Sequence, residues 1–326
     1  MRSFVVGPDD PGRFRFSASA LWEVLQAVRT LRDRAQQRYH RPWLEGVGVP
    51  AVLARLPTLT TLSPVHGYTP DFLTPPPDER RRPDPVRELA RLRATSAEVV
   101  TTALVEAVAR AATRPARDAV VALSADPERT LALAADELEV AWQLLVAPWW
   151  STIERLLEAD VAYRGTQILS DGLEAAVNDL DPRVRWHGDR VRISGGDGHE
   201  TSLDGQGLLL IPSAFGWPRV ISPDPPWPPA IAYPARGIGA LWSQSSRPPD
   251  SLGRLLGPHR ARVLAGLDLP TTTTDLALQL GLAAPSVSRH LAVLVDAGLV
   301  TKQRDGRRVP YRRTALGDSL VTASGP

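Results

Sequence analysis

The chain has 326 residues, enough for two or three domains with cores of their own, and a formal net charge of only +2 at pH 7. It contains no cysteine, which excludes disulfides, thiolate zinc sites and cysteine nucleophiles. Its six histidines are scattered, with no ligand-like pair four residues apart, so we expect neither a metal site nor a cofactor.

The sequence shows no segment that would direct the chain to a membrane. No apolar run is long enough to span a bilayer, and the N-terminal MRSFVVGPDDPG lacks the apolar core of a signal peptide. We therefore expect a cytoplasmic protein.

Residues 18–180 are predicted to be mainly helical. Arg13 to Ser17 first alternates like a short strand, and an apolar stripe then predicts a helix from Ser19 to about Arg38. Residues 41–82 are expected to be irregular, because the prolines of GYTPDFLTPPP (67–77) interrupt a regular helix. Further helices are predicted for residues 83–113, 126–146, 148–168 and 171–180.

The helix that begins at Pro148 combines aromatic and charged side chains. Trp149 and Trp150 stand at its start, and Asp160 and Arg164 lie on or beside its apolar stripe, four residues apart. Charges on a buried stripe are costly unless they are paired, so one hypothesis is an effector pocket formed by these four residues. The alternative is structural, with a salt bridge between Asp160 and Arg164 and the tryptophans in the core.

Residues 183–235 are predicted to form a small β-rich subdomain. VRWHGDRVRIS, GLLLIPSAF and PAIAYPA are its strand candidates. Ten of the 31 prolines lie in residues 212–249, so these strands must be short or at sheet edges. Residues 236–250 are expected to be a linker, which would complete an N-terminal domain of residues 1–250.

The basic residues are concentrated after that linker. Residues 251–326 hold ten Lys and Arg against five Asp and no Glu, a net charge of +5, whereas residues 1–250 carry −3. A basic excess of this kind is typical of a part that contacts nucleic acid.

Two short helices and a tight turn are predicted at the start of this basic part. The first helix has a start signal in Thr272, three residues before Asp275, and Gly281 is well placed to end it. The second is predicted from about Ala284 to Ala297, with Val287, Leu291, Leu294 and Val295 on its apolar face. This leaves short side chains that donate hydrogen bonds, and one arginine, pointing outward near its N-terminal end. Such an arrangement suits a helix that enters the DNA major groove.

An arginine-rich hairpin is predicted next. Residues 299–304 and 307–313 flank Asp305-Gly306, the two-residue signal for a type I′ turn. Its cations can follow a phosphate backbone or enter a minor groove. The candidate DNA contacts of the helix and the hairpin together are Ser286, Ser288, Arg289, His290, Arg304, Arg307, Arg308 and Tyr311.

In LLGPHRARVLAGL (255–267), TTTTDLALQLGL, PSVSRHLAVLVDAGLV and RDGRRVPYRRT, the chain resembles the winged helix-turn-helix domains of ArsR-type transcriptional regulators. The resemblance spans residues 255–314 and implies a homodimer that binds double-stranded DNA. It has two departures. Ala283 stands where the family often has a serine cap, and Pro310 interrupts the second strand of the hairpin.

A second resemblance concerns residues 18–243, which are similar to a poorly characterised domain that precedes ArsR-type readers in high-GC bacteria. The matching segments are GYTPDFLTPPP, LLEADVAYRG, GLLLIPSAFGWPRV and YPARGIGALW. This resemblance implies no particular ligand.

The sequence thus predicts an α+β, mainly α, protein with a regulatory or dimerisation domain (1–250) and a winged helix-turn-helix domain (251–326). We expect a sequence-specific transcriptional regulator that responds to a small-molecule effector and is not an enzyme, because no spacing matches a catalytic motif. One alternative is an enzyme or ligand-processing domain fused to a DNA-binding winged helix. Another is a regulator that binds a protein partner and no small ligand.

Overall fold

The computed structural model describes residues 1–37, 39–77, 83–195, 198–224, 227–242, 250–267, 271–302 and 309–323. The chain divides into two compact units, Met1–Ala235 and Arg236–Pro326. The division therefore falls after residue 235 rather than after residue 250, and the segment predicted as a linker belongs to the second unit. Within that segment lies a 3-10 turn, η5 (Ile238–Ala240).

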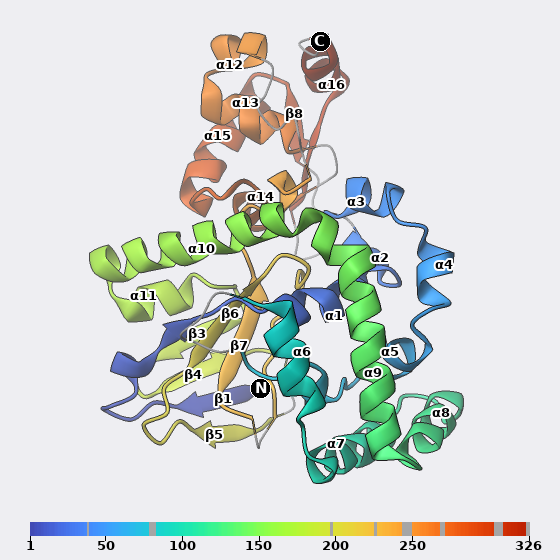
Figure 1. Ribbon diagram of the computed structural model, residues 1–326. Coiled ribbons are helices and arrows are strands. Elements are labelled where there is room, and N and C mark those ends of the chain that lie inside the picture. Colours follow the sequence, from blue (N-terminus) through green and yellow to red (C-terminus); the bar gives the residue numbers. More distant parts are fainter. Residues whose placement is uncertain are drawn as a thin grey trace. The chain divides into compact units, whose positions relative to one another are not determined.

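The first unit is mainly helical (Figure 1). Its α-helices are α1 (Ala20–Thr30), α2 (Arg34–Gln37), α3 (Arg41–Glu45), α4 (Val49–Leu53), α5 (Pro57–Leu62), α6 (Pro85–Arg93), α7 (Ala97–Ala109), α8 (Arg114–Ser124), α9 (Pro127–Ala141), α10 (Trp150–Asp171) and α11 (Leu173–Asn178). A π-helical turn, η3 (Trp142–Val146), and a 3-10 turn, η4 (Ala147–Trp149), join α9 to α10, and the chain bends there (Figure 1).

Local capping explains where these helices differ from the prediction. The stretch predicted as one helix over residues 83–113 is divided because the Ser96 hydroxyl caps α7 by accepting from the Val99 amide at 3.4 Å. The prediction that residues 41–82 are irregular was wrong, since they contain α3, α4 and α5. Each of these has a proline at its first or second position, where a missing amide hydrogen costs nothing. The same rule accounts for α8, which was not predicted.

Two sheets complete the first unit. Their strands are β1 (Arg2–Val5), β2 (Arg15–Phe16), β3 (Val184–His187), β4 (Arg190–Ile193), β5 (Glu200–Ser202), β6 (Leu209–Ser213) and β7 (Ala230–Pro234). One sheet has the order β3-β4-β1-β5, antiparallel except for the β1–β5 pair, and the other is the parallel sheet β2-β6-β7. The β-rich part is therefore not confined to residues 183–235, because the N-terminal strands β1 and β2 belong to the two sheets.

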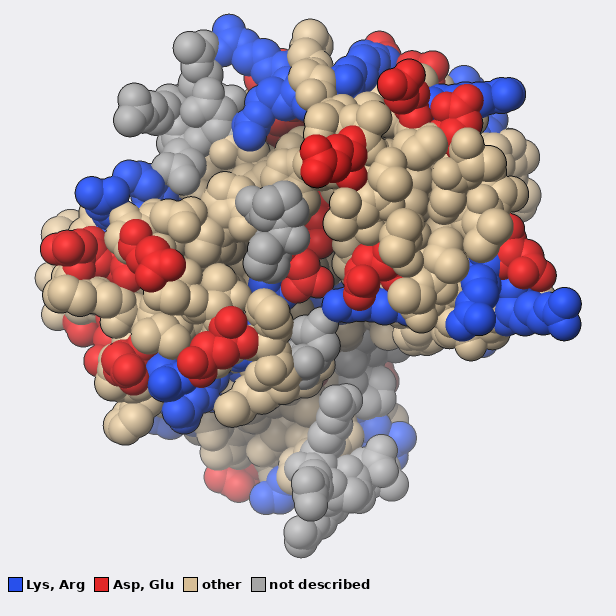
Figure 2. Space-filling view, turned by 90° about the horizontal axis from the view of Figure 1, so that it is seen from below, with Lys and Arg blue, Asp and Glu red and all other residues tan. Residues whose placement is uncertain are grey.

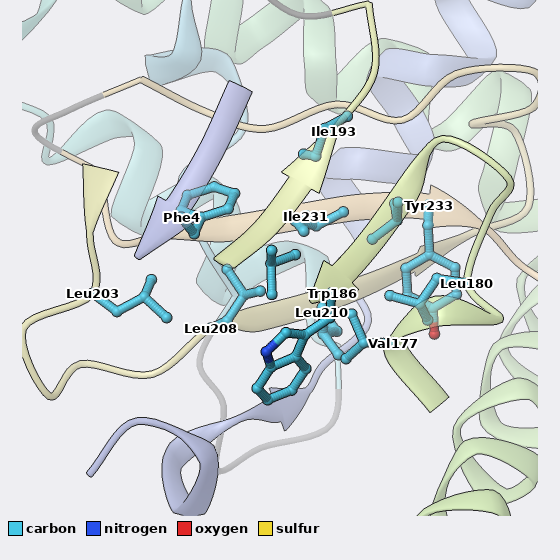
Figure 3. Close-up of a cluster of buried hydrophobic side chains, with 12 residues drawn as sticks. Phe4, Val177, Leu180, Trp186, Ile193, Leu203, Leu208, Leu210, Ile231 and Tyr233 are labelled. Carbon is cyan, nitrogen blue, oxygen red and sulfur yellow. The ribbon is translucent and has the colours of Figure 1, made fainter. Parts of the chain in front are cut away.

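Buried hydrophobic side chains form the core between these elements (Figure 3). Phe4, Val191 and Ile193 of the first sheet share it with Leu210 and Ile231 of the second. The alternating burial of β3 and β4 turns one face of each strand toward this core, as the period of two in VRWHGDRVRIS predicts.

The second unit contains five helices and a two-stranded hairpin within the residues described. They are α12 (Asp250–Leu256), α13 (Pro258–Ala265), α14 (Thr273–Leu280), α15 (Ala284–Asp296), α16 (Ala315–Ala323), β8 (Val300–Lys302) and β9 (Tyr311–Arg313). Two backbone hydrogen bonds join Thr271 to Tyr311 and extend the hairpin by a third short segment. The predicted fold class, α+β and mainly α with a C-terminal helix-turn-helix, is confirmed.

Candidate nucleic-acid interface and ligand cleft

The two helices of the predicted helix-turn-helix start and end as their sequence indicates. The Thr272 hydroxyl accepts from the Asp275 amide at 3.2 Å at the start of α14, and Gly281 follows the helix with φ = +64°, which suits a residue without a Cβ. α15 begins after Ala283, which supplies no side-chain cap.

α15 presents one apolar and one polar face. Val287, Leu291 and Leu294 are buried in the core of the second unit. Ser288 and Arg289 are exposed, on turns that the core does not cover. A helix held by one face, with a serine and an arginine free on another, is the arrangement that base contacts in a major groove require.

His290 is only partly available to solvent. Its ring stacks on that of His259 from α13 at a centroid distance of 5.8 Å, and its Nε2 lies 3.4 Å from the Ser286 hydroxyl. Burial, and then the neighbouring His259, Arg260 and Arg289, lower the pKa of His290. The imidazole is therefore neutral at pH 7, and Ser286 and His290 form a hydrogen-bonded pair beside the exposed Ser288 and Arg289.

Within the described residues, the hairpin is fixed to the rest of the unit. Its second strand begins at Tyr311, because Pro310 has no amide hydrogen for the ladder. The Tyr311 side chain is half-buried against the core, and Arg313 binds Asp318 at 2.7 Å and the carbonyl of Ala265 at 3.2 Å. Three predicted contacts of the hairpin tip, Arg304, Arg307 and Arg308, lie outside the described residues.

Two cations of this hairpin that were not among the candidate contacts are exposed, Lys302 and Arg312. Arg312 pairs with Thr301 across the ladder, so both side chains leave the same face. The buried Val300 belongs to the opposite face. Arg312 therefore extends from the outer face of the hairpin.

The predicted effector residues of α10 form two separate groups. Trp150 packs edge-on against Trp142 at 5.2 Å, at the start of the helix, and Trp149 precedes it. Asp160 and Arg164 lie ten and fourteen residues after Trp150, about 15–20 Å along the helix axis. They therefore do not converge with the tryptophans.

Asp160 and Arg164 instead belong to a buried network. The Tyr233 hydroxyl of β7 donates to Asp160 at 2.6 Å, and Arg164 donates to Asp179 at 2.6 Å while its Nε lies 3.9 Å from Asp160. Burial opposes the charge of Arg164, but Asp160, Tyr233 and Asp179 outweigh it and raise its pKa. Burial and the Asp160 carboxylate also raise the pKa of Tyr233, so its hydroxyl remains a donor. The geometry supports the structural interpretation, with α10 fastened to the parallel sheet.

The first unit contains a cleft of about 660 Å³ that the sequence did not suggest. Its lining includes Tyr68, Asp71, Glu98, Glu106, Arg110 and Trp227. One signal was present in the sequence, because Glu98, Thr102, Glu106 and Arg110 follow each other at intervals of four and so share one face of α7. The other side of the cleft comes from segments distant in sequence, which no local pattern brings together.

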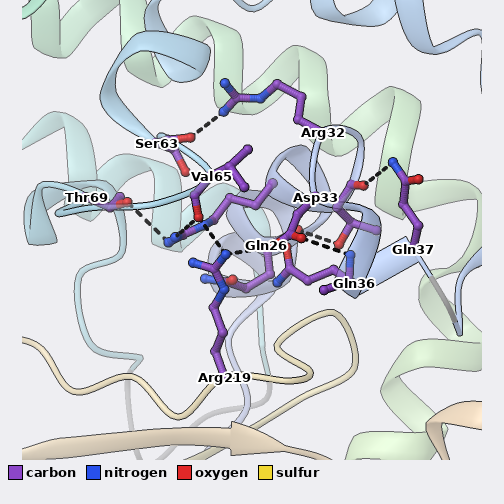
Figure 4. A network of polar contacts seen from close by, with 12 residues as sticks. Gln26, Arg32, Asp33, Gln36, Gln37, Ser63, Val65, Thr69 and Arg219 are labelled. Atoms are coloured by element: carbon purple, nitrogen blue, oxygen red, sulfur yellow. Dashed lines mark hydrogen bonds and ion pairs between the residues drawn. The ribbon is translucent and has the colours of Figure 1, made fainter. Parts of the chain in front are cut away.

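A polar network holds the segment that carries Tyr68 (Figure 4). Arg29 of α1 and Arg219 both donate to the Val65 carbonyl, at 3.5 and 2.6 Å, and Arg219 also pairs with Asp33 at 2.6 Å. Burial, and then the charge of Arg219, lower the pKa of Arg29 to about 9. These contacts fix Val65, three residues before the cleft residue Tyr68.

The helix-turn-helix and the hairpin define the C-terminal unit as a winged helix-turn-helix, a class of DNA-binding domain. Comparison with known families agrees: residues 255–303 match a helix-turn-helix domain. Residues 84–239 match a family of unknown function, DUF5937. No curated protein and no solved structure matches the chain significantly.

The chain thus carries an uncharacterised N-terminal domain and a C-terminal helix-turn-helix domain, which indicates DNA-binding transcription regulation. None of the helices in the described residues has both the length and the apolar character needed to cross a bilayer.

Proposed function

We propose that the chain is a sequence-specific transcriptional regulator of the ArsR type that works in the cytoplasm as a homodimer, responds to a small effector and has no catalytic activity. The observation that carries the proposal is the exposed pair Ser288 and Arg289 on α15, opposite the buried Val287, Leu291 and Leu294. Arginine can bind guanine O6 and N7 together, which distinguishes that base pair from the other three.

The wing supports the same function. Lys302 and Arg312 are exposed on adjacent strands, where each can pair with a DNA phosphate. A single winged helix makes few base contacts, so a dimer that reads two half-sites provides the affinity and the specificity.

A DNA shift assay tests the proposal directly. The full chain should retard a fragment that contains the intergenic DNA upstream of its own gene, and a scrambled fragment of equal length should need a higher protein concentration. Equal retardation of both fragments over a range of salt concentrations would show binding without specificity and would contradict the proposal.

A further inference from the structure

The strongest candidate for a site beyond the DNA interface is the cleft of the first unit. Its volume of about 660 Å³ lies within the range of small-molecule sites. We propose that this cleft binds a small organic cation with a flat or apolar body, and that this cation is the effector.

The expected charge of the ligand follows from the charges around the cleft. Four carboxyl groups line it, those of Asp71, Glu98, Glu106 and Asp224, against the single guanidinium of Arg110. Arg2 pairs with Asp224 at 2.5 Å and Glu106 pairs with Arg110, so two of the four are compensated. Figure 2, a view from below relative to Figure 1, shows several acidic side chains in the middle of the face, with basic ones beside them. The uncompensated charge is negative and attracts a cation.

Glu98 is the carboxylate most available to such a ligand. It lies in the first turn of α7, is exposed, and makes no ion pair with the other described residues. The same helix adds Val99, Thr102 and Ala103 to the lining, which is apolar surface with one hydroxyl group. A ligand ammonium at Glu98 would therefore leave its apolar body against α7.

Arg110 occupies the other end of the cleft itself and shows that the lining there stabilises a flat cation. Its guanidinium lies 5.0 Å from the centroid of the Tyr68 ring and 3.6 Å from Asp224, and it also pairs with Glu106. An aromatic face flanked by carboxylates is the environment that organic cations find favourable. Trp227 supplies a second aromatic side chain in the same lining.

Asp71 gives the site a proton-linked response. Its Oδ2 accepts from the Asp224 amide at 3.1 Å and from the Tyr68 hydroxyl at 3.4 Å. Burial, together with the charge of Asp224, raises the pKa of Asp71 to about 7. These hydrogen bonds and the positive charge of Arg2 act in the opposite direction but are outweighed. A bound cation favours the ionised carboxyl, so binding should release about half a proton at pH 7 and tighten as the pH rises through 7.

The test uses three ligands with one body and different charges: 1-naphthylmethylammonium, 1-naphthylmethanol and 1-naphthylacetate. Calorimetric titration of the full chain at pH 7, without DNA, should show binding of the ammonium. The alcohol should bind at least about tenfold more weakly, and the carboxylate more weakly still. Repeating the titration in two buffers that differ in ionisation enthalpy measures the released proton.

Glu98→Gln should weaken the binding of the ammonium by about three- to tenfold and leave the affinity for the alcohol unchanged. The matched control is Glu128→Gln, which should change neither affinity. Glu128 has an exposed carboxyl in the first turn of α9 and does not line the cleft. Asp71→Asn should abolish the proton release, and circular dichroism confirms that the variant is folded.

Equal binding of the alcohol or the carboxylate, equal effects of the two Glu→Gln variants, or no binding of the ammonium would each overturn the proposal. The effector role of the cation rests on the proposed function. The binding of the cation does not, because it is measured without DNA. Cation binding by a chain that shifts no DNA would contradict the proposed function alone, and specific DNA binding without cation binding would contradict the inference alone.

Discussion

The effect of a buried charge on the stability of the first unit depends on whether its partners are present. Asp160 and Arg164 are both buried, and Tyr233 completes the contact to the parallel sheet. Removing one partner from such a group leaves an uncompensated charge in a low-dielectric interior, which costs more than the intact pair contributes.

Asp160→Ala should therefore lower the free energy of unfolding of the first unit by about 3 kcal/mol, because the buried Arg164 loses its buried carboxylate and keeps the half-exposed Asp179 and the neutral Gln167. Tyr233→Phe, which removes one hydroxyl and keeps the ring, should cost only about 1–2 kcal/mol. Urea titration followed by tryptophan fluorescence measures both, since eight of the nine tryptophans lie in residues 1–235. An Asp160→Ala variant as stable as the parent chain, with an altered effector response, would instead favour the effector hypothesis for α10.

Glu23 predicts a pH dependence of stability. Its carboxyl is fully buried and accepts from the amides of Ala214 at 3.0 Å and Phe215 at 3.0 Å, but burial outweighs these bonds and raises its pKa from 4.5 to about 7. Between pH 4.5 and 7 the folded chain therefore retains a proton that the unfolded chain has lost, so stability falls as the pH rises through this window.

Glu23→Gln keeps a carbonyl acceptor for the two amides and removes the titration. The fall in unfolding free energy between pH 4.5 and 7 should be smaller in this variant, by up to about 1.4 kcal/mol per pH unit. Urea titrations at several pH values measure the slope. Identical slopes for the variant and the parent chain would show that Glu23 does not titrate in this range.

At the scale of elements, the sequence predicted well what local chemistry decides. The Thr272 cap, the Gly281 end and the buried stripe of α15 all follow from near neighbours, and all three are confirmed. The strand β2 was predicted from the alternation of Arg13 to Ser17, but β1 and the pairing of both strands could not be predicted in the same way. Their partners lie near residues 190–210, and no short-range pattern in MRSFVV indicates that pairing.

The same distinction between local and long-range contacts applies to the two candidate sites. Ser288 and Arg289 could be placed from the period of one helix, because burial of one face decides which side is exposed. The cleft needs α7, the segment around Tyr68 and the segment around Asp224 together. Only the tertiary fold brings these three parts to one place.

The missing cap of α15 leads to an element-scale prediction. Ala283 precedes the helix in extended conformation, which is the backbone geometry of a capping residue, but it has no side-chain acceptor. Ala283→Ser should stabilise the second unit by about 0.5–1 kcal/mol by accepting from an amide of the first turn. Thermal unfolding followed by far-UV circular dichroism measures the change, with Ala283→Val as the control of similar size that cannot cap. An equal effect of both substitutions would exclude capping as the cause.

For the whole molecule, the net charges of −3 in residues 1–250 and +5 in residues 251–326 support the proposed regulator, in which the basic C-terminal part binds DNA. The proposed dimer should contact half-sites about 10 bp apart, or a multiple of that spacing. Footprinting gives the spacing, and light scattering of the chain with and without DNA gives the stoichiometry. A stable monomer in both conditions would contradict the dimer.

The absence of cysteine from the chain also predicts that soft metals do not regulate it. Zinc or arsenite at micromolar concentrations should leave the DNA shift unchanged. Release of the DNA that a chelator reverses would show a metal site that the sequence does not suggest.

The measurement that tests the central claim most directly compares Arg289→Ala and Arg312→Ala on cognate and scrambled duplexes at several salt concentrations. Arg289→Ala should lose about 1–3 kcal/mol on the cognate duplex and little on the scrambled one, because a base contact is lost. Arg312→Ala should weaken both duplexes alike and reduce the salt slope by about one, because a phosphate contact is lost. If Arg289→Ala binds both duplexes as the parent chain does, or loses the same affinity on both, α15 does not read DNA through this arginine and the account is contradicted.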